Sequence, residues 1–216
     1  MTASRVPMTP EEFQREVGVS RETLAKLEAY ADLLVKWNRK INLVADSTLD
    51  DLWRRHMLDS AQLIFHLPPV PAGRRRVIID IGSGAGFPGM VLSVLGAGDV
   101  HLVDSDQRKA IFLREVAREV GSDAHIHAVR VEQMKDFAVD VVTARAFAPL
   151  PELLEQAEPY LREGVYGLFL KGKSANQELA EAELRWSMRA DRHPSRSDPS
   201  GTILQIGVLG REVVRH

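Results

Sequence analysis

The chain of 216 residues contains no cysteine. This absence excludes disulfide bonds, thiolate metal ligands and a cysteine nucleophile, and it agrees with a reducing compartment. The sequence also lacks any run of about 20 consecutive apolar residues, which a membrane-spanning helix would need. No signal peptide is recognisable before the charged N-terminal segment. We therefore expect a cytoplasmic protein that does not interact with membranes.

A surplus of basic residues is absent as well. The 28 lysine and arginine residues are outnumbered by 30 aspartate and glutamate residues, which gives a formal net charge of −2 at pH 7. Proteins that bind long nucleic acids over an extended surface usually have the opposite balance. A nucleic-acid partner would therefore have to be bound by a local basic patch.

Clusters of metal-ligating residues are missing from the sequence too. The seven histidines do not show the paired spacing of common metal sites, apart from His125 and His127. These two alternate along an expected strand, so both lie on one face of it, and we interpret them as flanking the sheet. The sequence therefore predicts no metal site.

The residues that are present indicate an ordinary folded protein, with 44% hydrophobic and 27% charged residues. Residues 9–67 show helical periodicity, beginning with the capping box TPEE at Thr9. The segment PPVPAG (68–73) cannot continue a helix and marks a boundary. We therefore divide the chain into an N-terminal helical lobe, residues 1–73, and a second domain, residues 74–216.

Short apolar runs alternate with helical segments in the second domain. The expected strands cover residues 77–81, 100–104, 124–129, 139–145, 165–171 and 202–209, and the expected helices cover residues 88–95, 107–120, 150–161 and 176–186. This alternation favours right-handed crossovers and a Rossmann-like, mostly parallel α/β sheet that is buried on both faces. No helix follows the last strand, which we expect to form an antiparallel edge. The polar segment 191–201 before it is expected to be a mobile loop.

The stretch DIGSGAGFPG (80–89) follows the first expected strand and combines an acid with closely spaced glycines. In an open α/β sheet the ligand binds at this edge, beyond the carboxyl ends of the strands. The letters GAGFPG, beginning at Gly84, match the G-x-G-x-x-G pattern of dinucleotide sites. Asp104 lies 20 residues beyond Gly84, where a ribose-binding acid is expected. This pattern leaves an NAD(P)-dependent oxidoreductase as one alternative.

The position of Asp80 favours a different ligand. The loop amides of a dinucleotide site face a pyrophosphate, and a carboxylate at the mouth of the loop would repel that group. S-adenosylmethionine has no phosphate and carries a sulfonium and an ammonium group, which an acid attracts. We therefore predict that Asp80, Gly82, Gly84 and Gly86 bind this cofactor, and that Asp104 accepts hydrogen bonds from its ribose.

Seven segments within about residues 24–175 carry a more specific pattern. They are KWNRKINLVA, RHMLDSAQLI, VIDIGSGAGFPGMVLSV, VHLVDSDQRKAIFLREV, VRVEQM, TARAFAPL and LFLKGK. Their content and order resemble the bacterial RsmG (GidB) family. The resemblance implies a class I methyltransferase fold and an S-adenosylmethionine-dependent enzyme that methylates N7 of a guanine in 16S ribosomal RNA, near the decoding site.

The resemblance also assigns two groups of residues. Cofactor-binding positions of the family match Gly82, Phe87, Val131, Glu132 and Arg145. Basic positions that the family places near cofactor or RNA match Arg108, Lys109 and Lys171. The implied partner is 16S ribosomal RNA or the small ribosomal subunit, and we expect the chain to act as a monomer.

The chemistry of the residues agrees with N7 of guanine as the methyl acceptor. Methylation of C5 of a pyrimidine ordinarily requires a cysteine nucleophile, and ARAFAP stands where exocyclic-amine methyltransferases usually carry an Asp/Asn-Pro-Pro-aromatic element. N7 already has a free lone pair, so catalysis consists of proximity and orientation and needs no general base. We predict that Arg145 contacts O6 of the base or the carboxylate of the cofactor, with a structural salt bridge as the alternative.

Several assignments stay open at this point. His56 and Asp59 lie one turn apart in a helix expected at about residues 48–66, and we interpret them as joining this helix to its neighbour rather than as cofactor contacts. The arginines at 74–76 could bind phosphates or form a solvated charge run, and Lys171 could contact RNA. A small-molecule methyltransferase and a non-catalytic RNA-binding protein also remain as alternatives.

Overall fold

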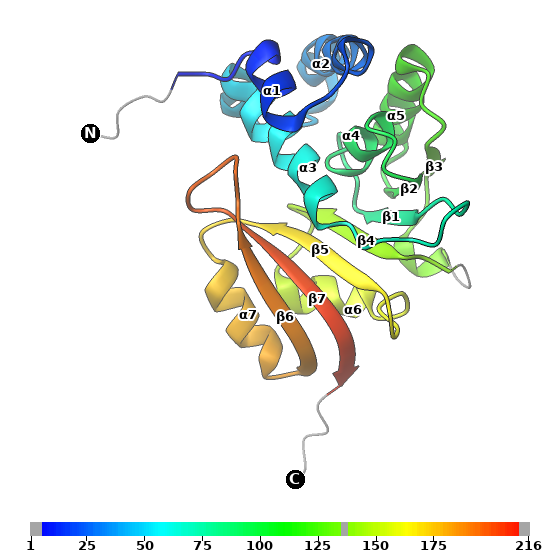
Figure 1. The fold of residues 1–216 in the computed structure, drawn as a ribbon, viewed down its shortest axis with the longest axis vertical. Coiled ribbons are helices and arrows are strands. Elements are labelled where there is room, and N and C mark those ends of the chain that lie inside the picture. Colours follow the sequence, from blue (N-terminus) through cyan, green and yellow to red (C-terminus); the bar gives the residue numbers. More distant parts are fainter. Residues whose placement is uncertain (1–5, 135–137, 212–216) are drawn as a thin grey trace.

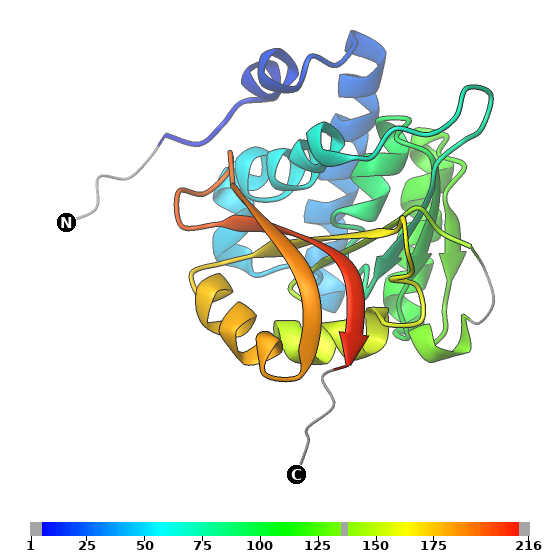
Figure 2. The same cartoon turned by 60° about the horizontal axis from the view of Figure 1, so that its bottom comes forward.

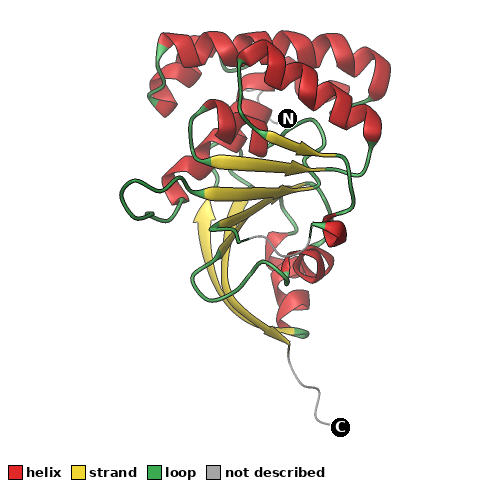
Figure 3. Cartoon of the chain, turned by 90° about the vertical axis from the view of Figure 1, so that its right-hand side faces the viewer, coloured by secondary structure: helices red, strands yellow, loops and turns green. Residues whose placement is uncertain are grey.

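The computed structural model describes residues 6–134 and 138–211 of the chain. Strands of the described part form one sheet with helices on both faces (Figures 1 and 3). The strands are β1 (Val77–Ile81), β2 (Asp99–Val103), β3 (His125–His127), β4 (Val141–Arg145), β5 (Tyr166–Lys171), β6 (Trp186–Pro194) and β7 (Thr202–Arg211). The α-helices are α1 (Pro10–Val17), α2 (Arg21–Ile41), α3 (Asp59–Ala61), α4 (Gly89–Val94), α5 (Gln107–Val120), α6 (Leu150–Ala157) and α7 (Ala175–Glu183). Short 3-10 or π turns are η1 (Asp46–Asp51), η2 (Trp53–Leu58), η3 (Gln62–His66) and η4 (Val131–Gln133).

The strand order is β3-β2-β1-β4-β5-β7-β6. Strands β1 to β5 run parallel, and β7 runs antiparallel to both of its neighbours. The predicted mostly parallel sheet with an antiparallel edge is confirmed. The strand order reverses between β1 and β4, so a ligand crevice is expected beyond their carboxyl ends.

The edge strand was predicted wrongly. Strand β6 begins at Trp186, where the sequence indicated the end of a helix, and it runs into the segment 191–201 that was expected to be a mobile loop. Strand β7 was expected at the edge but lies between β5 and β6. Strand β6 carries charged side chains and therefore lacks the apolar run by which a buried strand is recognised in a sequence. It is a strand because its backbone pairs with β7.

Two hydrophobic cores lie on the two faces of the sheet. One face packs against α6 and α7, and the other packs against α4 and α5. The N-terminal helices belong to the core that contains α4 and α5, because Leu27 of α2 and Leu63 of η3 lie in one buried cluster with Ile78 of β1 and Val100 of β2. Because the N-terminal helices share a core with the sheet, the division of the chain into two domains at residue 73 stays a prediction. No helix in the described ranges has the length and apolar character needed to cross a bilayer.

In the N-terminal helices one prediction is confirmed and another is corrected. The capping box at Thr9 is present, because Thr9 and Glu12 each accept the other's backbone amide. The helix expected at residues 48–66 is instead a succession of 3-10, π and α turns. Short π segments widen a helix locally and frequently occur at functional sites, and this one carries His56.

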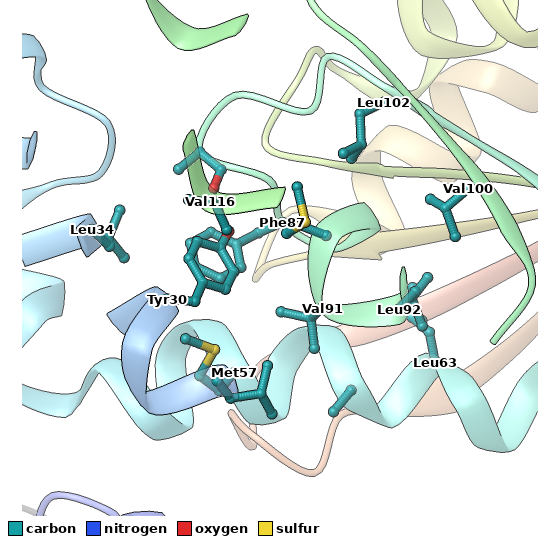
Figure 4. Packing of buried hydrophobic residues seen from close by; sticks show 14 of the residues in the cluster. Tyr30, Leu34, Met57, Leu63, Phe87, Val91, Leu92, Val100, Leu102 and Val116 are labelled. Atoms are coloured by element: carbon teal, nitrogen blue, oxygen red, sulfur yellow. Dashed lines mark hydrogen bonds between the residues drawn. The ribbon is translucent and has the colours of Figure 1, made fainter. Parts of the chain in front are cut away.

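Helix α2 directly contacts the glycine loop, residues 82–89, which follows β1. Tyr30 is fully buried, its hydroxyl donates to the carbonyl oxygen of Ala85, and its ring lies against Phe87 with centroids 5.3 Å apart (Figure 4). Gly86 has a φ of +95°, and a β-carbon there would lie 2.6 Å from the Tyr30 hydroxyl. Gly86 is therefore required by packing between the N-terminal lobe and the sheet.

Candidate active site

A cavity of about 660 Å³ opens at the carboxyl ends of the central strands. Its walls come mainly from the N-terminal turns at 43–59, the glycine loop at 82–87, the connection after β4 at 145–149, the end of β5 at 170–172, and the residues between 195 and 202. A volume of this size is typical of sites for small molecules. The crevice that the strand order predicts is therefore present.

Several backbone amides of the glycine loop already donate to acceptors inside the protein. The amide of Gly84 donates to Asp104 Oδ2 at 2.8 Å, and that of Gly89 donates to Asp80 Oδ2 at 3.2 Å. The amides that donate to carbonyl oxygens of the chain include those of Ser83, Gly86 and Phe87. A pyrophosphate needs such amides as donors. The loop is thus better suited to a ligand without phosphate than to a dinucleotide.

Asp80 does not line the cavity, and its contact with the cofactor stays a prediction. The side chain is fully buried and accepts hydrogen bonds from Thr143 Oγ1 at 2.7 Å and from the amide of Gly89. Burial raises the pKa of Asp80 to about 6, against the lowering effect of these hydrogen bonds. Its carboxylate accepts the first amide of α4, a position that favours anionic ligands. Asp80 thereby stabilises the glycine loop from its buried side.

Asp104, Val131 and Glu132 also lie outside this cavity, further along the same edge of the sheet. The Asp104 carboxylate follows β2 and accepts the amides of Gly84 and Asp106, each at 2.8 Å. Val131 is buried in η4, while Glu132 is exposed. Gly84 connects Asp104 to the cavity, because it lines the cavity and its amide binds the Asp104 carboxylate.

Gly82 and Gly84 line the cavity, and both have left-handed backbone angles, with φ of +65° and +57°. A β-carbon at Gly82 would lie 2.0 Å from Cδ2 of Phe147, whereas one at Gly84 would meet nothing closer than 3.8 Å. Phe147 was not singled out from the sequence. It follows Ala146, which has an unusual φ of +50°, and its ring covers the glycine loop.

Arg145 projects from the end of β4 to the cavity wall and is held by four contacts. Its guanidinium donates to the carbonyl oxygen of Arg55 at 2.9 Å, to Asp59 Oδ2 at 3.3 Å and to His56 Nδ1 at 2.9 Å. It also lies 4.7 Å from the centroid of the Phe87 ring. The side chain is 15% exposed. The salt bridge considered as an alternative is present, and it holds Arg145 at the cavity rather than away from it.

His56 is neutral in this arrangement. A guanidinium can only donate, so His56 Nδ1 accepts from Arg145 and the proton is on Nε2. That proton is donated to Thr48 Oγ1 at 2.7 Å, and Thr48 in turn donates to Ala45. Burial, followed by the charges of Arg145 and Arg55, lowers the pKa of His56 to about 3. Both ring nitrogens are engaged, so His56 positions Arg145 and does not act as a base.

The interpretation of His56 and Asp59 as a tie between helices is incomplete, because both also line the cavity. Asp59 further binds the connection between β6 and β7, accepting from Ser197 Oγ at 2.6 Å. The amide of Arg196 donates to Gln62 Oε1 at 2.8 Å. The connection at 195–201 is thus attached to the N-terminal turns (Figure 2). These contacts join residues more than 130 positions apart, and no local sequence signal indicates them.

The predicted basic positions differ in their surroundings. Lys171 is 9% exposed, forms an ion pair with Glu178 at 2.8 Å and donates to the carbonyl oxygen of Ala148 at 2.6 Å. These partners occupy Lys171 within the protein. Lys109 and Lys171 both line the cavity, and Arg108 is exposed outside it.

The arginines at 74–76 lie before β1, at the opposite edge of the sheet from the cavity. Arg74 binds both carboxylate oxygens of Asp140, at 2.8 and 2.7 Å, and Arg75 binds Asp123. Arg76 donates to backbone carbonyl oxygens. All three therefore attach the start of β1 to neighbouring segments.

Comparison with solved structures identifies the fold. The O-methyltransferase from Bacillus cereus in complex with SAH has a TM-score of 0.61 at 15% identity, and the match covers 91% of this chain and 96% of that chain. A mutant of MtNAS in complex with S-adenosylmethionine has a TM-score of 0.56 at 14% identity, covering 93% and 84%. The predicted class I methyltransferase fold is confirmed.

Comparison of sequences identifies the family. The family model described as "rRNA small subunit methyltransferase G" matches residues 23–197. "Ribosomal RNA small subunit methyltransferase G" from Rhodospirillum rubrum is 55% identical over 204 residues, covering 94% of this chain and 100% of that protein. The protein of the same name from Paramagnetospirillum magneticum is 53% identical, covering 94% and 98%. The chain therefore belongs to the rRNA small subunit methyltransferase G family.

Proposed function

We propose that this chain transfers a methyl group from S-adenosylmethionine to N7 of a guanine in 16S ribosomal RNA. Family membership and the names of the relatives support the class of reaction and the RNA substrate. The observation that carries the assignment of the site is Arg145. It is fixed by His56, Asp59 and the Phe87 ring at the wall of a cavity that the glycine loop also lines.

The residues present fit this cofactor. S-adenosylmethionine supplies an electrophilic methyl group on a sulfonium sulfur and has no phosphate, which agrees with a loop in which the amides of Ser83, Gly84, Gly86, Phe87 and Gly89 already have acceptors. Asp104 uses one acceptor position of each oxygen for an amide and keeps lone pairs for ribose hydroxyls. We assign Val131 and Glu132 to the adenine side, as the family resemblance implies. Gly84 has room where a β-carbon would go and lets the backbone approach the ligand closely, whereas the ring of Phe147 fills that space at Gly82. The NAD(P)-dependent alternative is not favoured.

Arg145 would orient the guanine. Arginine commonly binds guanine through both O6 and N7, but here N7 must stay free to attack the methyl group. We therefore assign a hydrogen bond from Arg145 to O6. No residue needs to remove a proton from N7, and the neutral His56, whose two nitrogens are engaged, agrees with a site that lacks a general base.

The RNA would be held by a local patch, since the net charge is −2. Arg55, Lys109 and Lys171 line the cavity. We assign Lys109 and Arg55, whose ion pair with Asp198 is half-exposed, to RNA phosphates, while the buried Lys171 is paired with Glu178. Such a patch predicts a shallow dependence of binding on salt concentration. We further propose that the chain acts as a monomer in the cytoplasm, on the 16S RNA or the small subunit, without contact to a membrane.

The experiment measures transfer of labelled methyl from S-adenosylmethionine to small ribosomal subunits that lack this modification. Arg145→Ala is expected to reduce turnover by about 100-fold or more, the scale of a lost orienting contact, while the melting temperature shows that the variant folds. Arg74→Ala, at the opposite edge of the sheet, is the matched control and should be fully active. Unchanged turnover in Arg145→Ala would contradict the assignment. Calorimetry with S-adenosylhomocysteine and with NADH tests the cofactor independently.

A further inference from the structure

A cluster of imidazoles lies on the sheet away from the cavity. Asp99 and His101 belong to β2, and His125 and His127 belong to β3. In the parallel register His101 pairs with His125, and Val103 pairs with His127. Side chains two positions apart point to the same face of a strand, so the three imidazoles and the carboxylate share one face. None of the four lines the cavity.

Three of these side chains bring ligand atoms together. Nε2 of His125 lies 3.0 Å from Oδ1 of Asp99, and Nε2 of His101 lies 3.9 Å from Oδ2 of Asp99. One ligand atom from each residue falls within 4.8 Å of the other two. In a tetrahedral zinc site with bonds of about 2.1 Å, ligand atoms are about 3.4 Å apart. The observed separations bracket that value.

His127 provides the kind of support that metal-binding histidines have. Its Nε2 lies 3.0 Å from Nδ1 of His101, and the two rings are inclined by only 8°. If His101 binds an ion through Nε2, its Nδ1 carries the proton and donates to His127, which fixes the orientation of the ring.

We propose that Asp99, His101 and His125 bind one divalent transition-metal cation of the zinc type, with His127 as the positioning residue of His101. Two imidazoles and one carboxylate suit zinc, whereas magnesium and calcium prefer all-oxygen sites. The fourth position would be held by water. This proposal replaces the expectation, drawn from spacing alone, that the histidines only flank the sheet. The ion would join β3, a strand of three residues, to β2.

The test uses the full chain without a histidine tag. Titration with Zn2+ is expected to show one ion per chain with a dissociation constant on the order of micromolar, and Co2+ should give the absorption of a tetrahedral site. At zinc concentrations about 100 times the dissociation constant, the melting temperature should rise by about 5–10 °C. Absence of binding at 100-fold higher zinc, or an octahedral Co2+ spectrum, would overturn the proposal.

Variants locate the ion. His125→Ala changes a half-exposed side chain and is expected to weaken zinc binding at least about 100-fold, and Asp99→Asn should do the same if the first variant is unstable. His127→Ala should weaken it about 10-fold, the usual effect of an outer partner. The matched control is His193→Ala, because His193 lies against His66 elsewhere, with ring centroids 4.4 Å apart. Loss of binding in this control, with binding retained in His125→Ala, would place the ion elsewhere and refute the proposal.

Discussion

Gly86→Ala tests whether the glycine loop is shaped by packing against the N-terminal helices as well as by its ligand. Gly86 does not line the cavity, although the sequence predicted that it would bind the cofactor. It has a φ of +95°, and an added β-carbon would lie 2.6 Å from the hydroxyl of Tyr30 and 2.9 Å from atoms of Leu113 and Met90. The substitution therefore combines backbone strain with overpacking in a fully buried region.

The magnitude follows from these two effects. A left-handed backbone costs a residue with a β-carbon about 1–2 kcal/mol, and overpacking a tight core costs about 1–3 kcal/mol. We expect Gly86→Ala to lower the free energy of unfolding by about 2–5 kcal/mol. For a chain of this size each kcal/mol lowers the melting temperature by about 2–4 °C. The loss should thus be at least about 4 °C.

The assay is urea unfolding of wild type and two variants, compared at constant m-value. Gly96→Ala is the matched control, because Gly96 has a φ of +69° and open space where the β-carbon would go. It should lose only the strain, about 1–2 kcal/mol. If Gly86→Ala is no less stable than Gly96→Ala, the contact between Tyr30 and the loop does not constrain it, and the reasoning is refuted.

Three further predictions concern the site and its surroundings. Thr48→Val removes the acceptor that fixes the His56 ring, so turnover should fall about 10-fold, or about 1.4 kcal/mol in activation free energy, with little change in melting temperature; equal turnover would contradict the positioning role. Burial raises the pKa of Asp80 to about 6, so the folded state binds more protons than the unfolded state between about pH 4 and pH 6. The free energy of unfolding of wild type should fall by about 3 kcal/mol relative to Asp80→Asn as the pH rises from 4 to 7, and parallel profiles would refute this. Lys171→Met leaves Glu178 without its cation and should cost about 3 kcal/mol of stability, measured by urea unfolding, while the salt dependence of RNA binding stays unchanged; a reduced salt slope would instead assign Lys171 to the RNA.

The parts of the fold with strong local signals could be predicted from the sequence. The apolar run at 77–81 coincides with β1, and the periodic segment 107–120 coincides with α5. The sequence did not predict strand β6, because this edge strand pairs, among the described strands, only with β7 and lacks the apolar run of a buried strand. Its charged residues therefore resemble those of a loop.

The candidate site was predicted only in part. The glycine loop and Arg145 lie at the predicted edge because strand ends follow from the alternation of elements. Asp80 lies on the same face of β1 as Ile78, but Ile79 on the other face is fully buried as well. Alternation along this strand therefore does not indicate which way the carboxylate points. The contacts that Asp59 makes with Arg145 and with Ser197 join distant segments. They depend on how the N-terminal turns dock and cannot be read from spacing.

The central claim is that the cavity presents guanine N7 to the methyl group without a base. It is tested most directly by mapping the product in unmodified small ribosomal subunits after one turnover with labelled S-adenosylmethionine. We expect the label on N7 of a single guanine of the 16S RNA, at a rate that does not change between about pH 7 and pH 8.5, because N7, His56 and Asp80 all titrate below this range. Label on another atom or in no RNA, or a rate that rises tenfold per pH unit, would contradict the account.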